Sequence, residues 1–600
     1  MNEAGHGAGS SSRSLDNVLR ILGNPGAFQI IQFTLLAIQY HPLAFNDFMP
    51  IFYGLPPHKI RCRNDTGVAE VSSKLTQKEM DSSTTGYRLY GPMHSNTNFS
   101  DVCLTGCPHG MEYVYPENQW SIIGDMDLIC DKASLVNLAS VIYFLGQIAG
   151  TPFFGWAADK FGRRITLLLS NLVYASLTAG LIFSRDFLSF AILRFCVGLA
   201  TQGINSSFYV LIVEWLPPER RRTWGALAEV QYTIGALIII VVAWHLQNWH
   251  HIQIFLAAYS TLAVLLIWFA PESLGWLCLN NRGKEAENYC NSVLKFNRMK
   301  LSFDEEKEIQ LFVQTEPQTP KSVAVYSFAD CFRTPYLRRT TLLSCYIWLA
   351  AYVGYLGIPY MSSEIAANIY VNLITNAALE FIPVFAAAGI ASRFGNRVPL
   401  TLYFLIGGIC CTAAGVIPGN TSAEVIAQNV VSFVGRMSLV GTICIIFVYT
   451  SELFPTVIRN NGFNMCSITL RVGSMIAPLL PIMSSQAGYK GSGFLLAGLI
   501  SLVASAASFS LRETKGEPLM ETIDDTIHIT GKSPMAKLAE LASELRNRRK
   551  NKTTTPPFSH GIILTELPLQ ARAPTVPVQG QDPSTFQDSD VDTLPGKKIS

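Results

Sequence analysis

Residues 155–164 read Gly-Trp-Ala-Ala-Asp-Lys-Phe-Gly-Arg-Arg, a charged turn that directly follows a long apolar run. A related stretch, Ala-Ser-Arg-Phe-Gly-Asn-Arg at residues 391–397, follows another apolar run about 240 residues later. The glycines at 162 and 395 permit a tight turn between two helices, because glycine adopts backbone conformations that other residues avoid. The recurrence predicts a chain built from two similar halves.

Two further landmarks recur in the same order. The first is Glu-Trp-Leu-Pro at 214–217, which returns as Glu-Leu-Phe-Pro at 452–455. The second is Pro-Glu-Ser at 271–273, which returns as Arg-Glu-Thr at 512–514. Three charged motifs that repeat in order favour two parallel repeats of six helices each.

The composition is typical of a membrane protein. The chain has 600 residues, of which 49% are hydrophobic and 15% charged, whereas a soluble domain has about 25% charged residues. Apolar runs long enough to cross a bilayer alternate with charged segments. They predict an all-α membrane protein with twelve transmembrane helices, near residues 28–50, 134–156, 165–184, 187–212, 224–245, 252–270, 340–361, 367–391, 399–418, 425–449, 462–484 and 493–511.

Basic residues predict the orientation. They gather in the short loops that carry Lys160, Arg220 and Arg393, so this set of loops is expected to be cytoplasmic. Both termini and the central segment then lie on the same side. The predicted parts are a cytoplasmic N-terminus (1–27), a first bundle (28–270) with an extracellular loop (51–133), a cytoplasmic central segment (271–339), a second bundle (340–511) and a largely disordered cytoplasmic tail (512–600).

The predicted extracellular loop has the composition of a secreted segment. It contains four of the 13 cysteines and two glycosylation acceptor motifs. The candidates for disulfides are Cys62, Cys103, Cys107 and Cys130, and those for glycosylation are Asn64 and Asn98. Four cysteines allow three pairings, which stay open, and four free thiols are the alternative.

The acidic residues that recur in the cytoplasmic motifs predict a latch. Asp159, Glu214 and Glu452 can each face arginines, and such pairs would hold the cytoplasmic ends of the halves in one conformation and break in the other. The arginines concerned are Arg163, Arg164, Arg221 and Arg459. The alternative is that the basic loops only fix topology, but topology alone does not require the acids.

The motifs resemble those of the major facilitator superfamily, and more closely those of the organic cation, anion and carnitine transporters among the solute carriers. The resemblance covers about residues 15–525. Beyond the large cysteine-bearing loop, it rests on Val213–Trp215, Phe328–Pro335, Gly435–Met437 and Tyr449–Arg459. It implies two pseudo-symmetric six-helix bundles, an alternating-access mechanism and small amphiphilic organic ions as substrates.

Arg471 is the sharpest candidate for binding substrate, because an ionisable residue inside a span is costly and needs a reason. In the resembling family this position tends to be basic in carriers of anions and carnitine, and acidic in carriers of cations. A guanidinium facing a cavity can bind a carboxylate through two parallel hydrogen bonds. The alternative is a structural ion pair with Glu380 or Glu229.

Other residues within spans are weaker candidates. The aromatic side chains Tyr232, Tyr355, Trp348 and Tyr352 would hold the apolar body of a substrate, with packing as the alternative. Glu380 is also a candidate, although it lies three residues before Pro383 where the family has its acid two before, an offset that would rotate it away from the cavity.

Three further ionisable residues have other expected roles. Arg194 and Arg436 occupy equivalent places in the repeat, which favours a structural or gating role. Asp47 lies late in the first span, and solvation near the outer face is its alternative to a binding role.

The sequence therefore predicts a polyspecific transporter of small organic ions, closer to the organic anion side and moving anions or zwitterions. One alternative is a cation carrier that uses Glu229, Glu380 or Asp47. Another is a divergent member that does not transport, since Ser392, Leu274 and Arg512 depart from the family pattern.

The expected partners are a small amphiphilic ion and the lipid bilayer of the plasma membrane. Nothing in the sequence is typical of an enzyme, a cofactor, a metal site or a nucleic-acid-binding protein, and no oligomeric state is indicated.

Overall fold

The computed structural model describes most of the membrane-embedded chain. The described residues are 15–23, 26–57, 59–62, 111–116, 118–314, 327–365, 368–419, 421–486, 488–489, 491–515, 520, 522–523 and 526. They fall within one compact unit, residues 1–533. Asn64, Asn98, Cys103 and Cys107 lie outside the described residues, as does the side chain of Cys62.

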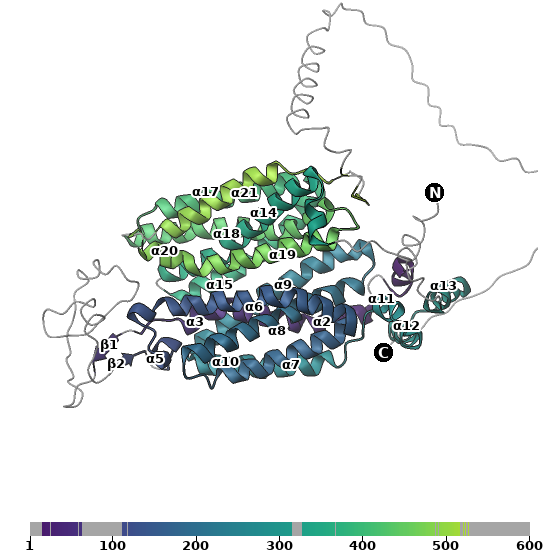
Figure 1. Ribbon diagram of the computed structural model, residues 1–600, viewed down its shortest axis with the longest axis horizontal. Coiled ribbons are helices and arrows are strands. Elements are labelled where there is room, and N and C mark those ends of the chain that lie inside the picture. Colours follow the sequence, from purple (N-terminus) through teal and green to yellow (C-terminus); the bar gives the residue numbers. More distant parts are fainter. Residues whose placement is uncertain are drawn as a thin grey trace, which may run out of the picture. The chain divides into compact units, whose positions relative to one another are not determined.

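The first half contains six spans, and its helices run side by side (Figure 1). The first is interrupted: α2 (Ala27–Ala37) passes through the 3-10 turn η1 (Ile38–Tyr40) into α3 (His41–Tyr53). Pro42 accounts for the interruption, because its ring removes a helical hydrogen bond to the preceding turn. The other five are α6 (Ser134–Phe161), α7 (Arg163–Leu181), α8 (Phe187–Glu214), α9 (Pro218–Leu246) and α10 (Trp249–Ile267).

The second half repeats this pattern with two interruptions. Its eighth span breaks at Glu380, and its eleventh breaks at the 3-10 turn η5. In order, the helices are α14 (Pro335–Ile365), α15 (Ile369–Leu379), α16 (Phe381–Phe394), α17 (Arg397–Val416), α18 (Ser422–Leu453), α19 (Arg459–Ile476), η5 (Ala477–Leu479), α20 (Leu480–Gln486) and α21 (Ser492–Phe509).

Among the described residues, 11 helices are long and apolar enough to cross a membrane. The interrupted first span makes the twelfth, because each of its two pieces is short while together they run from residue 27 to 53. The prediction of an all-α membrane fold with twelve spans in two pseudo-symmetric bundles is confirmed. Most predicted ends lie within a few residues of the observed ones; the largest shift is at α9, which begins at Pro218, six residues early.

The segment between the halves is helical in part. It contains α11 (Leu274–Leu279), α12 (Gly283–Asn297), α13 (Phe303–Gln314) and the 3-10 turn η4 (Phe328–Phe332). Asn297 ties α12 to the first span, because its Oδ1 accepts from the amide of Phe28 at 2.9 Å.

A helical stretch at residues 15–21 packs on the same side through buried Val18 and Leu19. Arg20 donates to Glu219 at 2.6 Å, and this hydrogen bond holds the pKa of the Glu219 carboxyl below its ordinary value.

At the other end of the helices lies what is described of the large loop. Strand β1 (Lys59–Cys62) pairs antiparallel with β2 (Met111–Val114), followed by α5 (Ile122–Met126) and the 3-10 turn η3 (Cys130–Lys132). Asp125 anchors this region to the start of α10, because its Oδ2 accepts from the indole of Trp249 at 2.6 Å. Cys130 is disulfide-bonded, and which of the other three cysteines it pairs with stays a prediction. We call this the loop end of the bundle and the opposite end, with the 162 and 395 turns, the motif end.

Candidate functional site

At the motif end, a glutamate caps the helix that follows the first charged turn. Gly162 has a φ of 103°, which an L-residue rarely adopts, and α7 starts directly after it. The carboxylate of Glu272 accepts from the amides of Arg163 and Arg164 at 3.0 and 3.1 Å. Burial raises the pKa of Glu272, while the backbone hydrogen bonds oppose that rise. A negative charge here also complements the positive end of the helix dipole.

The second half repeats this device. Gly395 has a φ of 87°, and Glu513 accepts from the amides of Asn396 and Arg397 at 3.1 and 3.2 Å. Within each half, the glutamate of the Pro-Glu-Ser or Arg-Glu-Thr motif (Glu272 or Glu513) therefore binds the turn that contains Gly162 or Gly395. The sequence revealed that these glutamates recur but not what they bind.

Replacing Glu272 with alanine is expected to lower the free energy of unfolding by about 1–2 kcal/mol, because the first amides of α7 lose their acceptor. Glu513→Ala should lower the free energy of unfolding by a similar amount, because amides at the start of α17 lose their acceptor. The thermal midpoint of the purified protein in detergent measures the effect. Glu287→Ala, an exposed position on α12, is the matched control. Midpoints equal to the control for both variants would refute the capping role.

The predicted latch residues form ion pairs within the first half. Arg163 Nη2 lies 3.2 Å from Asp159 and 3.1 Å from Glu214, although the Asp159 side chain is 79% exposed. The equivalent place in the second half holds Asn396, whose amide donates to Glu452 at 2.7 Å. At the position of Arg163, the second half therefore has an uncharged donor to the glutamate.

The remaining arginines of the predicted latch also bind nearby groups. Arg164 donates to the carbonyl of Trp268 at 2.8 Å, and Arg459 to the hydroxyl of Thr456 at 3.1 Å. Arg221 pairs with Asp16 at 3.1 Å. Every contact just named joins parts of one half, so none of them is a latch across the halves in this conformation. The latch stays a prediction for another conformation.

Named side chains from the two halves meet at the loop end. Tyr370 of α15 stacks on Phe52 of α3, with ring centroids 6.1 Å apart, and on Trp244 of α9, with centroids 6.2 Å apart. Deeper, the hydroxyl of Tyr360 donates to the carbonyl of Asp47 at 3.0 Å. These contacts hold the halves together at the loop end.

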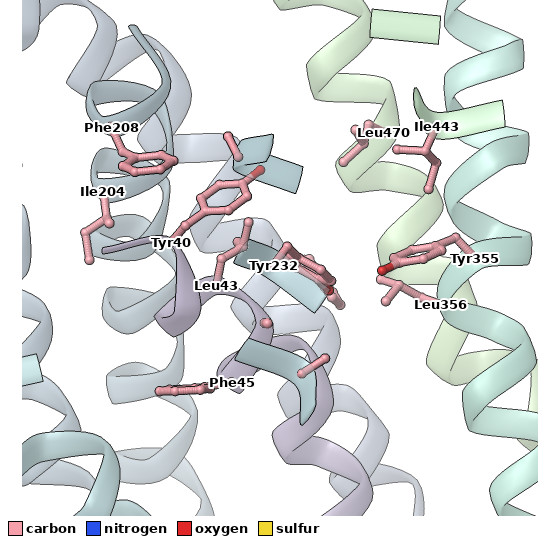
Figure 2. Packing of buried hydrophobic residues seen from close by; sticks show 14 of the residues in the cluster. Tyr40, Leu43, Phe45, Ile204, Phe208, Tyr232, Tyr355, Leu356, Ile443 and Leu470 are labelled. Carbon is pink, nitrogen blue, oxygen red and sulfur yellow. The ribbon is translucent and has the colours of Figure 1, made fainter. Parts of the chain in front are cut away.

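Four tyrosines line the middle of the boundary between the halves, and we call Tyr40, Tyr232, Tyr352 and Tyr355 the tyrosine box. Tyr232 lies between Tyr40 and Tyr355, with centroids 6.3 and 6.2 Å away, and Tyr352 is 5.8 Å from Tyr355. Figure 2 shows Tyr232 and Tyr355 facing one another from opposite halves. Three members were predicted; Tyr40, in the first span, was missed, because the sequence does not give the direction of its side chain around the helix axis.

Arg471 sits beside the box in the middle of α19. It is 4% exposed, and its Nη2 donates to Gln202 of the other half at 3.2 Å. Its Nε has no hydrogen-bond partner. Within the part of the chain that the structure describes, it makes no ion pair. The alternative of a structural ion pair with Glu380 or Glu229 is therefore wrong for this conformation.

Glu380 instead pairs with Arg436, and both are buried. Arg436 also donates to the carbonyl of Tyr355 at 2.5 Å and lies over its ring. Glu380 accepts from Thr233 of the other half at 3.1 Å, so the expected rotation away from the boundary is wrong. The break between α15 and α16 falls at Glu380 and points its side chain to this boundary.

Arg194, the equivalent arginine of the first half, has a different setting. It is fully buried and donates to Asn46 at 2.8 Å. Its guanidinium lies over the ring of Tyr143, 4.6 Å from the centroid. The repeat therefore preserves an arginine over a tyrosine in each half, but an acid only in the second.

Asp47 is buried, which rules out solvation at the outer face. It is 2% exposed, and its Oδ2 accepts from the hydroxyl of Tyr232 at 3.0 Å. Trp348, by contrast, is packed inside the second half, where it donates to Thr450 at 2.8 Å and contacts Phe447 and Phe463. The structure does not bring Trp348 together with the tyrosine box.

Comparison with known proteins matches residues 68–525 to the sugar (and other) transporter family. Solute carrier family 22 member 1 from Bos taurus is 31% identical over 87% of this chain and 94% of its own length. Organic anion transporter 3 from Mus musculus is 28% identical, over 85% of this chain and 94% of its own length.

Among solved structures, the inward open conformation of the xylose transporter XylE from E. coli gives a TM-score of 0.56. It is 14% identical and covers 81% of this chain and 97% of its own, a likeness that concerns the fold. Given this fold, the paired helix-capping motifs and these similarities, the chain belongs to the sugar (and other) transporter family and, within it, to solute carrier family 22.

Proposed function

We propose that the chain is an alternating-access carrier of small amphiphilic organic ions that favours anions or zwitterions. The observation that carries the proposal is Arg471, a buried guanidinium between the halves with an unused donor and no acidic partner among the described residues. A buried cation without a counter-ion is costly. A substrate carboxylate or sulfate would supply both the missing charge and the missing acceptor.

The surroundings of Arg471 support an amphiphile. The tyrosine box offers apolar ring faces and hydroxyl groups next to the guanidinium. Relatives named as organic anion transporters are consistent with this chemistry.

Alternating access is supported by the distribution of contacts. The halves meet through Tyr370 at the loop end, while the motif-end ion pairs named above lie within single halves. If the halves rock against each other, the contacts at the loop end would break while the motif ends of the two halves come together. We place the carrier in the plasma membrane, with both termini and the motif end cytoplasmic and a glycosylated, disulfide-bonded outer loop.

Uptake in cells that express the full chain tests the proposal. We expect saturable uptake of a radiolabelled aromatic carboxylate above mock-transfected cells, inhibited by excess organic anion and not by a quaternary ammonium lacking a carboxylate. Uptake of the cation alone would refute the anion preference. Absence of uptake with normal surface labelling of the chain would refute transport itself.

A further inference from the structure

Three of the free cysteines gather in the second half, toward the motif end: Cys331, Cys345 and Cys466. Cys345 lies on α14 and Cys466 on α19, each within about three turns of the residue at which its helix begins. Cys331 lies in η4, just before α14, and interacts electrostatically with both of the others. The proposed function uses none of these thiols.

The thiols of Cys345 and Cys466 are neighbours, because they share a hydrogen bond between α14 and α19. Thr469 is a second hydrogen-bond partner of Cys345, and its hydroxyl donates to the carbonyl of Cys466 at 2.8 Å. Two sulfur atoms within hydrogen-bond reach need only a small movement to form a covalent bond.

The backbones of α14 and α19 also approach each other closely. The rings of Trp348 and Phe463 are 5.2 Å apart. One turn after Cys345, the carbonyl oxygen of Leu349 would lie 2.5 Å from a Cβ placed at Gly473, so only glycine fits there. A disulfide requires Cα atoms about 4.4–6.8 Å apart. This close approach of the helices favours such a separation for the two cysteines.

The two thiols differ in exposure. Cys466 is fully buried, whereas Cys345 is partly exposed. Oxidation by peroxide begins at an accessible thiol, and a second thiol beside it then displaces the oxidised oxygen. The pair therefore contains one thiol that peroxide can reach and one that can form the disulfide. A cysteine that serves only as a small apolar side chain needs no second thiol in contact with it.

We propose that Cys345 and Cys466 form a site of reversible oxidation, at which hydrogen peroxide creates a disulfide between α14 and α19 and slows the carrier. Peroxide converts the thiol of Cys345 to a sulfenic acid and is itself reduced to water. The sulfur of Cys466 then attacks the sulfenic sulfur; the S–S bond forms, the S–O bond breaks, and the hydroxyl leaves as a second water with the proton of Cys466. A cytosolic thiol such as glutathione reverses the reaction by thiol–disulfide exchange.

The disulfide would tie together two helices that border the tyrosine box. Tyr352 lies about two turns after Cys345 on the same face of α14, and Arg471 lies beyond Cys466 on α19. Arg471 and Tyr352 interact electrostatically, so the two helices place their side chains near one another at the boundary. A covalent tie would restrict adjustments between these helices during the transport cycle. This effect on uptake rests on the proposed function, whereas formation of the disulfide does not.

Mass spectrometry of the purified full chain in detergent tests the site itself. The protein is treated briefly with hydrogen peroxide, its free thiols are alkylated, and it is digested without reductant. We expect a linked pair of peptides that contain Cys345 and Cys466, lighter by two hydrogen atoms than the sum of the free peptides and released by dithiothreitol. Alkylated Cys345 and Cys466 after the treatment, or a bond from Cys345 to Cys331, would overturn the inference. This measurement requires neither a variant nor transport.

Uptake of a radiolabelled aromatic carboxylate by cells that express the full chain gives the second readout. Peroxide should lower the initial rate of the wild type by about half or more, because a conformational change is part of every cycle, and dithiothreitol should restore it. Cys345→Ala and Cys466→Ala should keep their uptake in peroxide. Cys410→Ala, at a partly exposed cysteine on α17, is the matched control and should lose uptake as the wild type does.

The two readouts separate the possible failures. Unchanged wild-type uptake while the disulfide forms, or equal inhibition of the wild type and of surface-expressed Cys345→Ala and Cys466→Ala, would overturn the effect on the carrier. Absence of uptake by surface-expressed wild type before peroxide is added would overturn the proposed function, and the peptide map would still decide whether the thiol pair is oxidised.

Discussion

Replacing Arg471 with alanine is expected to lower uptake of an anionic probe about 100-fold. Truncating one member of a buried, hydrogen-bonded charge pair costs several kcal/mol, and every 1.4 kcal/mol is tenfold in affinity. The effect should be large because the guanidinium has no acidic partner among the described residues that could take over its role with the substrate. The ratio kcat/KM for the probe, normalised to surface-labelled protein, measures it.

Arg471→Lys is the matched control, because lysine keeps the charge but not the planar fork of donors. We expect it to retain a weaker anion uptake, between alanine and wild type. Arg471→Asp should go further: with Asp47 and Glu229 nearby, it adds a third acidic residue to the boundary between the halves and should favour cationic probes. Unchanged anion uptake by a surface-expressed alanine variant would contradict the role of Arg471 in binding.

The sequence predicted the spans closely because a span is a local property. Any run of about 20 apolar residues must pair its backbone groups within a helix. The early start of α9 escaped prediction because residues 219–222 are charged, and hydropathy does not register a helix that extends beyond the membrane.

Partners across helices could not be predicted in the same way. Hydropathy places Glu380 and Arg436 inside spans but does not give their directions around the helix axes, which packing between helices sets. For the same reason Trp348 was grouped with Tyr352, four residues away on the same helix. In the structure Trp348 turns into the second half while Tyr352 faces the boundary.

The repeat carried information that composition did not. Glu272 and Glu513 recur because each completes the start of a helix in its own half, a role visible only once residues about 110 apart are brought together. The equivalent arginines, Arg194 and Arg436, each lie over a tyrosine ring of their own half. Among the described residues, Arg436 forms an ion pair with an acid and Arg194 does not. This difference allows the energetic role of the acid to be measured within one molecule.

Replacing Arg436 with methionine is expected to destabilise the protein by about 3–5 kcal/mol, the cost of leaving one member of a buried ion pair uncompensated. Glu380 would keep only neutral donors, from Thr233 and Tyr355. The double variant Arg436→Met/Glu380→Gln should recover most of the loss, because it removes both charges. Thermal midpoints of purified protein in detergent, arranged as a double-mutant cycle, give the coupling between the two residues.

Arg194→Met is the internal control for this prediction. Its guanidinium donates to Asn46 and has no acidic partner within the described residues, so its removal strands no buried carboxylate in contact with it. We therefore expect it to cost about 1–2 kcal/mol, as for a lost hydrogen bond and ring contact. Equal destabilisation by Arg194→Met and Arg436→Met, with no recovery of stability in the Arg436→Met/Glu380→Gln double variant, would contradict this prediction. The ion pair with Glu380 would then not account for a difference between the two halves. A large recovery would show that the second half depends on this pair for its stability, since only there does the repeat place an acid against the arginine.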